Sequence, residues 1–226
     1  MSVTVLIHAC PQRMWYVENF LAPELGAQGA DVTIWNDAYK RGNLDACMDS
    51  FAAVRGDGAI WHIQDDVLPC RNFVQRCEDY EDAGIVYGFC CEQFTDDPRQ
   101  TGRVHLPDAW HSFQCVRIPN AYARECAEWV RSGRWQQESP DPNLPIFRKL
   151  NKGDDAFFLS FLNCRHDRIL ITNAKPNLVE HIDWIIGGST LHEFRDYLAR
   201  ATFWDDEDLV TETAARIKAF KWQNAT

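Results

Sequence analysis

The chain has 226 residues, a formal net charge of -10 and a pI of about 5.1. This acidic balance argues against a broad nucleic-acid-binding surface and against a lysine-lined face that binds membranes. Hydrophobic residues make up 46% of the chain and aromatic residues 12%. These are ample for a large core, so we expect one domain, alone or with a helical tail.

The nine cysteines are odd in number and irregularly spaced, and no two of them form a Cys-x-x-Cys pair. This pattern is typical of buried, reduced thiols in a cytoplasmic protein, and it argues against both a disulfide framework and a zinc site. No apolar run approaches about 18 residues, and the first residues lack the regions of a signal peptide. We therefore expect a cytoplasmic protein without a transmembrane helix.

Strands and helices alternate in the first part of the chain. Short β-branched runs predict strands, and apolar residues at helical spacing predict helices, with Asn43 as an N-cap. The predicted strands are 3–7, 31–35, 59–63 and 84–88, and the predicted helices are 14–25, 44–54 and 69–80. Such alternation predicts right-handed crossovers and a mostly parallel sheet that is covered on both faces.

The rest of the chain is less regular. The pattern predicts a loop at 94–110, a strand at 111–118, a helix at 119–129, a loop at 132–145, a helix from 153 to 162, a strand at 169–171 and an amphipathic helix at 205–222. The expected organisation is therefore one domain over 1–190, with a helical extension over 191–226 packed on it.

Two adjacent carboxylates, Asp65 and Asp66, follow the apolar run 58–63. Like charges this close repel each other, and burial would add to the cost. A divalent cation such as Mg²⁺ or Mn²⁺ would remove the problem, whereas a solvated corner at the strand end is the plain alternative. His8 and Asp37 also follow predicted strands, and parallel sheets bind ligands at these carboxyl ends.

Several segments together resemble nucleotide-sugar glycosyltransferases of the GT-A type. They are 7–14, Trp35-Asn36-Asp37 with Gly42-Asn43, Gln64-Asp65-Asp66, Gly153-Asp154-Asp155 at a helix start, and 176–181. The resemblance spans residues 3 to about 190. It implies a single Rossmann-like α/β domain with a mostly parallel central sheet and a C-terminal helical tail, of a kind found in bacteria and phages.

The resemblance implies a metal site that holds Mn²⁺ or Mg²⁺. Gln64-Asp65-Asp66 falls where the family has an Asp-x-Asp metal motif. Gln64 is a departure from that motif, so metal ligation rests mostly on Asp66, with Asp65 as a further ligand or a contact to the ribose. His181 resembles a late histidine that completes the metal site, although it is also compatible with a buried core histidine.

The other implied contacts belong to the nucleotide sugar. Arg13, Asp37 and Asn43, together with Gln64 and Asp65, match segments that bind the base, ribose or diphosphate in the family. An arginine near a diphosphate has an evident purpose, although Arg13 is also compatible with a surface position.

The acidic pair Asp154 and Asp155 resembles the pair that carries the catalytic base. For an inverting enzyme we expect Asp155 to accept the acceptor's proton, with Asp154 in reserve. A retaining enzyme would not need a base at this position. Ordinary carboxylates in the first turn of a helix are the alternative, since the helix dipole favours them there.

The implied function is metal-dependent transfer of a sugar from a nucleotide-diphosphate sugar, UDP-linked by preference. The acceptor is a surface glycan or, less favoured because the chain is acidic, a modified base of phage DNA. One alternative is a nucleotidyltransferase on a related fold, which usually has a glycine-rich loop that 9–13 lacks. The other is a non-catalytic nucleotide-binding protein, which the departure at Gln64 favours.

Overall fold

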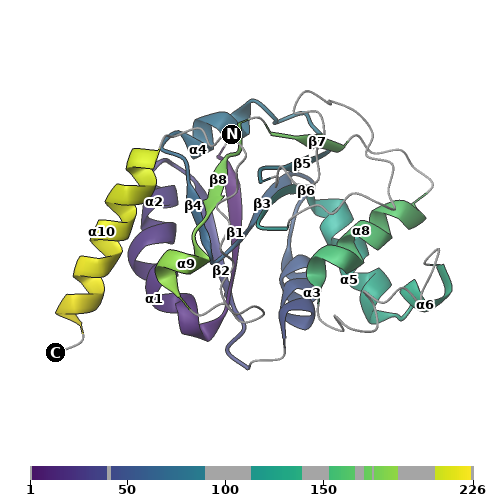
Figure 1. The fold of residues 1–226 in the computed structure, drawn as a ribbon. Helices are drawn as coiled ribbons and strands as arrows, with labels where there is room; N and C mark the ends of the chain where they lie inside the picture. Colours follow the sequence, from purple (N-terminus) through teal and green to yellow (C-terminus); the bar gives the residue numbers. More distant parts are fainter. Residues whose placement is uncertain are drawn as a thin grey trace.

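The computed structural model describes residues 2–39, 42–89, 113–138, 153–165, 171–174, 176–187 and 207–224 (Figure 1). At its centre is a six-stranded sheet with the strand order β2-β1-β3-β6-β5-β7. The strands of this sheet are β1 (Thr4–Ala9), β2 (Asp31–Asn36), β3 (Ala59–Gln64), β5 (Ile85–Tyr87), β6 (Cys115–Pro119) and β7 (Ile171–Asn173). Two further strands, β4 (Val67–Pro69) and β8 (Val179–His181), form a separate small antiparallel sheet.

Five of the six strands in the central sheet run in the same direction. β1 is parallel to β2 and β3, and β5 is parallel to β7. β6 is antiparallel to its neighbours β3 and β5, so it is the reversed strand among those described. The predicted α/β fold with a mostly parallel central sheet is confirmed.

Helices cover both faces of the sheet. Those in the first half are η1 (Pro11–Arg13), α1 (Met14–Tyr16), η2 (Val17–Leu21), α2 (Ala22–Ala27), α3 (Asn43–Ala53) and α4 (Phe73–Glu78). Those in the second half are α5 (Asn120–Arg131), α6 (Trp135–Glu138), α8 (Asp154–Cys164), α9 (Asp183–Ile186) and α10 (Glu207–Gln223).

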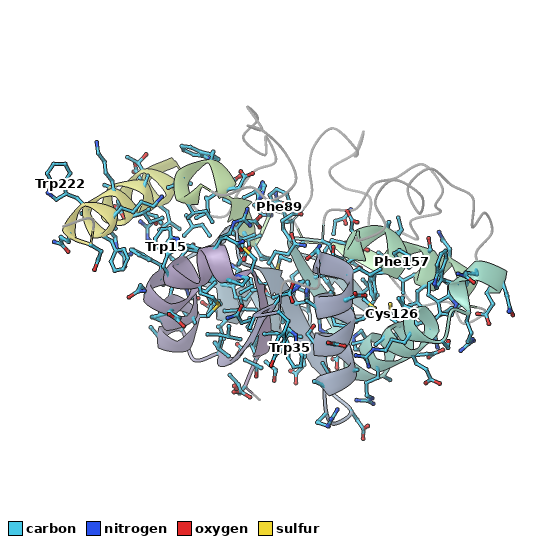
Figure 2. All side chains as sticks on the ribbon, turned by 90° about the horizontal axis from the view of Figure 1, so that it is seen from below. Trp15, Trp35, Phe89, Cys126, Phe157 and Trp222 are labelled. Atoms are coloured by element: carbon cyan, nitrogen blue, oxygen red, sulfur yellow. The ribbon has the colours of Figure 1, made fainter. Side chains whose placement is uncertain are left out.

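Alternate side chains of the central strands enter two separate cores, because successive residues of a strand point to opposite faces. Val5 packs with the helices from α1 to α2 and with α4, whereas Leu6 and Ile60 pack with α3, α5 and α8. Figure 2 shows the two helical layers, with Trp15 in one and Phe157 in the other. Whether a polar residue is at an odd or an even position along β1 or β3 therefore decides which of the two cores its side chain faces.

The first helical region differs in detail from the single helix predicted at 14–25. It starts earlier, with a 3-10 turn at Pro11–Arg13, and η2 is a π-helical turn within it. Proline suits the first position of such a turn because its missing N–H would have no partner there. The early start places Arg13 directly beyond the end of β1.

Three other predicted elements need correction. The helix predicted at 69–80 is shorter, because Pro69 ends β4 and pairs with Val179, and α4 starts only at Phe73. The predicted loop at 132–145 contains the short helix α6, whose Trp135 ring packs on Phe157. The predicted strands at 111–118 and 169–171 correspond to β6 and β7; β6 begins at Cys115, and residues 169–170 lie outside the described residues. The predicted loop at 94–110 lies outside the described residues.

The C-terminal helix α10 lies beside the first helical region (Figure 1). The Phe220 ring stacks on Trp15 with centroids 5.9 Å apart and meets Phe20 edge-on at 5.4 Å. Lys221 donates a hydrogen bond to the Ile186 carbonyl at 2.8 Å. The predicted boundary between 1–190 and 191–226 falls outside the described residues. None of the described helices has the length and apolar character needed to cross a bilayer.

Gly88 follows β5 at a place where two strands and an aromatic ring leave no room. A methyl group there would lie 2.5 Å from the Sγ of Cys115 and 3.3 Å from the Trp61 ring. We expect Gly88→Ala to lower the free energy of unfolding by about 1–3 kcal/mol in a denaturant titration, through overpacking. The matched control is Gly26→Ala in α2, where nothing lies within 4 Å. It should raise stability by about 0.5–1 kcal/mol, and a loss equal to that of Gly88→Ala would contradict the packing argument.

Candidate functional site

The predicted site residues gather at the carboxyl-end edge of the parallel strands. Arg13 follows β1, Asp37 follows β2, and Asp65 with Asp66 follows β3. His181 reaches the same edge because β8 pairs with β4 immediately after the aspartates, in the register Val67 with His181. Asp154 and Asn43 arrive from the first turns of α8 and α3. These residues form two neighbouring clusters.

The first cluster, here called the arginine–carboxylate cluster, consists of Arg13, Asp65, Asp66 and His181. Nη1 of Arg13 lies 2.7 Å from Oδ1 of Asp65 and 2.7 Å from Oδ2 of Asp66. Arg13 is only 5% exposed, so the predicted alternative of a surface arginine is wrong. Removing one partner from such a buried ion pair costs about 3–5 kcal/mol, because the remaining charge is left uncompensated.

Both oxygens of Asp65 already accept hydrogen bonds from the chain. Oδ1 accepts from Arg13, and Oδ2 accepts from the backbone N–H of Cys10 at 2.6 Å. These contacts fasten the turn after β1 to the turn after β3. Asp65 therefore acts first as an anchor for the 10–13 turn, and it offers less to a metal ion than Asp66 does.

Asp66 is placed differently from its neighbour. Its Oδ2 lies 2.7 Å from Arg13 and 3.3 Å from Nε2 of His181, whereas its buried Oδ1 has no hydrogen-bond partner in the described part of the chain. Burial alone would raise the pKa of Asp66, but His181 and Arg13 outweigh burial and hold it well below its usual range. Burial, followed by the charge of Asp66, raises the pKa of Asp65. Asp66 therefore stays ionised, and it keeps one open oxygen.

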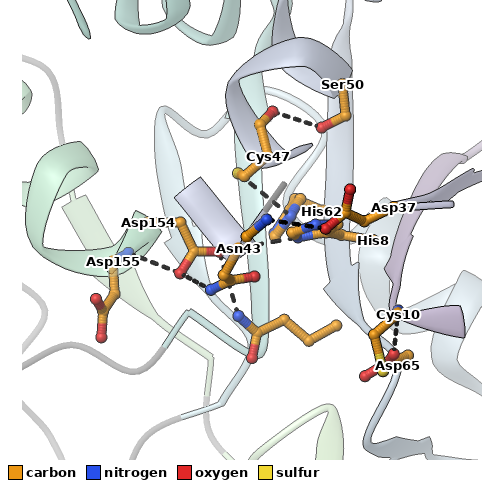
Figure 3. Close-up of polar contacts among 12 residues, drawn as sticks. His8, Cys10, Asp37, Asn43, Cys47, Ser50, His62, Asp65, Asp154 and Asp155 are labelled. Atoms are coloured by element: carbon orange, nitrogen blue, oxygen red, sulfur yellow. Dashed lines mark hydrogen bonds and ion pairs between the residues drawn. The ribbon is translucent and has the colours of Figure 1, made fainter. Parts of the chain in front are cut away.

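The second cluster, here called the histidine–cysteine cluster, consists of His8, Cys47, His62 and Asp154 (Figure 3). His8 and His62 occupy the positions on β1 and β3 that alternate toward α3 and α8. Sγ of Cys47 lies 3.8 Å from Nε2 of His62, and Nδ1 of His8 lies 3.9 Å from Oδ2 of Asp154. All four side chains are buried.

Two amide side chains fix the carboxylate of Asp154. Nδ2 of Asn43 donates to Oδ1 at 2.5 Å, and Nε2 of Gln64 donates to Oδ2 at 3.3 Å. The predicted N-cap role of Asn43 is wrong, because Gly42 takes the cap position with φ 106° and Asn43 is the first helical residue. Gln64 has a structural reason to be an amide, since its N–H donates to Asp154, which an ionised aspartate at this position could not do.

Burial keeps the second cluster uncharged. Burial, reinforced by the neighbouring Asp155, raises the pKa of Asp154 to about 8. Burial lowers the pKa of His8 to about 4, against the opposing charges of Asp37 and Asp66. Burial also lowers the pKa of His62 well below its usual value. At neutral pH the imidazoles are therefore neutral, and most of the Asp154 carboxyl keeps its proton.

Asp155 and Asp37 lie at the borders of the clusters. Asp155 is half-buried at the start of α8, where its Oδ1 accepts the Ala156 N–H at 2.7 Å. Its position next to Asp154 fits the expected acidic pair, and it is the more accessible of the two. Asp37 is buried, and its Oδ2 accepts the N–H of Gly42 at 3.1 Å. It holds the approach to α3, so this contact alone explains an aspartate here.

Sequence reasoning missed Cys47 and His62 as neighbours of Asp154, and it missed Asp183. Oδ1 of Asp183 lies 3.7 Å from Nδ1 of His181, an electrostatic contact that is longer than a hydrogen bond, whereas Nε2 of the same ring lies 3.3 Å from Asp66. His62 carried a signal that could have been used, since it is a polar residue in the middle of an otherwise apolar strand. The place of Cys47 on the apolar face of α3 gave no signal of its own.

The pKa of Asp154 predicts how stability depends on pH in metal-free buffer containing a chelator. The folded chain keeps this proton up to about pH 8, whereas the unfolded chain releases it near pH 4. The unfolded state thus binds fewer protons in this window, so this group makes stability fall as the pH rises. We expect wild type to lose up to about 1.4 kcal/mol per pH unit relative to Asp154→Asn between pH 5 and pH 8.

The measurement is a set of denaturant titrations of wild type and Asp154→Asn at several pH values. The difference between the two curves isolates Asp154 from the opposing effect of the buried histidines. Asp49→Asn is the matched control, since Asp49 is an aspartate on α3 that lies outside both clusters. A difference curve that is flat, or that rises with pH, would contradict a protonated Asp154.

Comparison with known proteins finds only distant likeness. No family model matches the sequence, and no curated protein matches it. One similar solved structure is HddC from Yersinia pseudotuberculosis, with 10% identity, a TM-score of 0.39, and coverage of 76% of this chain and 89% of that one. Another is the galactosyltransferase LgtC in complex with donor and acceptor sugar analogs, with 11% identity, a TM-score of 0.47, and coverage of 95% and 96%. The fold class therefore rests on the chain's own sheet, a mostly parallel α/β sheet with its clusters of polar residues at the carboxyl-end edge.

Proposed function

We propose that the chain is a metal-dependent glycosyltransferase that uses a nucleotide-diphosphate sugar, UDP-linked by preference. The observation that carries the proposal is the open oxygen of Asp66 beside His181, at the carboxyl ends of the parallel strands. This edge is where α/β sheets of this kind bind nucleotides. The acceptor is a glycan or, less favoured, a modified DNA base.

The charge of the arginine–carboxylate cluster supports a donor that arrives together with a cation. Arg13 contributes one positive charge, and Asp65 and Asp66 contribute two negative charges when both are ionised. Because Nη1 of Arg13 already contacts both carboxylates, much of its positive charge is neutralised within the protein. A bare diphosphate would meet a site without surplus positive charge, so a divalent cation is needed to attract it.

The residues of this cluster fit Mg²⁺ or Mn²⁺. Hard cations prefer carboxylate oxygens, with imidazole as an acceptable further ligand, and a buried carboxylate oxygen without a partner is the kind of atom that they take. Asp66 and His181 would hold the ion, and Asp183 would contact Nδ1 of His181 electrostatically. When bound, the ion would neutralise charge on the diphosphate leaving group.

The proton from the acceptor would go to Asp155 in an inverting reaction. Asp154 is fully enclosed and keeps its own proton at neutral pH, since burial raises its pKa to about 8. A carboxyl that already holds a proton cannot accept another, whereas half-buried Asp155 lies on the open side of the same turn. Asn43 and Gln64 would hold Asp154 in place, and Asp154 in turn would support the first turn of α8.

Metal-dependent nucleotide binding is the first test of this proposal. In calorimetric titrations of the purified chain with UDP, we expect binding in the presence of Mn²⁺ and little binding in its absence. Asp66→Asn keeps the size of the side chain but removes the charge. It should weaken the Mn²⁺-dependent UDP affinity at least about tenfold. Even the loss of a residue that contacts only a metal ligand, and not the metal, typically lowers metal affinity by about 10–100-fold.

Asp79→Asn, on the exposed end of α4, is the control and should bind UDP as wild type does. Equal UDP binding with and without Mn²⁺ would overturn the metal dependence. If UDP and the other nucleoside diphosphates all fail to bind, the glycosyltransferase proposal fails, and Asp65 and Asp66 are then a purely structural corner.

The assignment of the base predicts different behaviour for the two neighbouring aspartates. With water as the acceptor in a UDP-sugar hydrolysis assay, Asp155→Asn should lower kcat by about 10²–10⁴-fold and leave UDP affinity unchanged. Asp154→Asn mimics the protonated acid and should lower kcat much less. The reverse order would assign the base to Asp154, and equal full activity of both variants would indicate a retaining reaction without a base here.

A further inference from the structure

Four side chains that commonly ligate metals converge in the histidine–cysteine cluster, from four separate elements. His8 comes from β1, His62 from β3, Cys47 from α3 and Asp154 from α8. One ligand atom from each lies within 4.8 Å of the corresponding atoms of the others. This cluster shares no residue with Asp66 and His181, so the proposed function does not use it as a metal site.

We propose that His8, Cys47, His62 and Asp154 form a structural zinc site. Two imidazoles, one thiolate and one carboxylate make a closed set of four protein ligands, which is typical of structural rather than catalytic zinc. The site would fasten the ends of β1 and β3 to the two helices that cover this face of the sheet. Its function would be to hold the edge of the sheet, whichever reaction takes place beside it.

The distances in two of the ligand pairs fit a small contraction around a zinc ion. Zinc bond lengths of about 2.0–2.3 Å in a tetrahedron place neighbouring ligand atoms roughly 3.3–3.6 Å apart. The present separations are 3.8 Å between Cys47 and His62 and 3.9 Å between His8 and Asp154. Movements of a few tenths of an ångström would bring these two pairs to zinc geometry, and any pair at the 4.8 Å limit would have to close by roughly 1.2–1.5 Å.

The chemistry of this ligand set separates it from the arginine–carboxylate cluster. Thiolate and imidazole ligands select zinc, whereas carboxylate-dominated sites suit magnesium and manganese. Zinc binding would displace two protons, one from the Cys47 thiol and one from the Asp154 carboxyl, because both ligands bind metal in their deprotonated forms. One chain would thus hold two sites of different metal preference.

The surroundings of the cluster resemble the second shell of a metal site. Asn43 and Gln64 donate to the two oxygens of Asp154 and orient that carboxylate. The His62 ring packs against Phe51 at 5.3 Å and Phe113 at 4.8 Å, which gives the site an apolar wall. A wall of this kind excludes water and strengthens binding of a charged ion to its ligands.

The proposed zinc site runs against the expectation that irregular cysteine spacing argues against zinc. That expectation rested on the irregular spacing of the cysteines along the chain. Here a single thiol joins ligands that lie up to 146 residues apart in the chain, from His8 to Asp154. Spacing along the sequence carries no signal for such a site, because the fold alone brings the ligands together.

The test is metal uptake by the full chain, purified, stripped with a chelator and kept reduced. After addition of Zn²⁺ and desalting, elemental analysis should find about one zinc ion per chain. With Co²⁺ as a spectroscopic substitute, we expect a thiolate-to-cobalt charge-transfer band and the intense visible bands of four-coordinate cobalt. Neither readout depends on glycosyltransferase activity, so this inference and the proposed function fail separately.

Matched cysteine variants locate the site. Cys47→Ser should lose the thiolate-to-cobalt band, whereas Cys77→Ser should keep it, because Cys77 is an equally buried thiol in the opposite core. If Cys47→Ser fails to fold, Asn43→Ala provides the test, since it keeps all four ligands. It should weaken cobalt affinity by about 10–100-fold through the lost support of Asp154.

Three results would overturn the zinc site. The first is a stripped wild-type chain that takes up no stoichiometric zinc. The second is a cobalt spectrum that is the same in Cys47→Ser and wild type. The third is the weak visible spectrum of six-coordinate cobalt, which would place the ion on oxygen ligands such as Asp66 instead.

Discussion

A buried guanidinium between two adjacent carboxylates determines how this end of the sheet is organised. Without Arg13, Asp65 and Asp66 would face each other in a poorly solvated corner, and at least one would have to take up a proton. With Arg13 in place, Asp65 fastens the turn after β1, and Asp66 stays ionised with an oxygen to spare. The same ion pair thus stabilises the turn and prepares the proposed metal ligand.

The alternation of side chains along β1 and β3 places the two clusters in different environments. Residues that face α3 and α8 include both histidines, and the surrounding aromatic rings keep them neutral. The turns beyond the same strands leave the sheet and carry the charged residues. A neutral, soft-ligand cluster and a charged, oxygen-rich cluster can therefore lie side by side without sharing ligands.

Sequence patterns predicted the mostly parallel sheet because β1, β2 and β3 are short apolar runs separated by amphipathic helices. They also predicted that His8, Asp37, Asp65 and Asp66 lie at one edge, since carboxyl ends of parallel strands share an edge, whereas Arg13 and His181 were expected there only from the resemblance. They did not predict β4 and β8, which are three residues each and too short for periodicity. They missed Cys47 and His62 as members of one cluster because its residues come from four separate elements. Residues brought together in this way have no regular spacing along the sequence.

The separation of the partners along the chain sets the order in which the clusters can form during synthesis. Arg13 and Cys10 have left the ribosome before Asp65 is made, and their contacts close loops of 52 and 55 residues. The contact from Asn43 to Asp154 spans 111 residues. The nascent chain can therefore assemble β1, β2 and β3 around the arginine early, while His8, His62 and Cys47 wait for α8. During that interval the unfinished cluster exposes a free thiol and two imidazoles to metal ions.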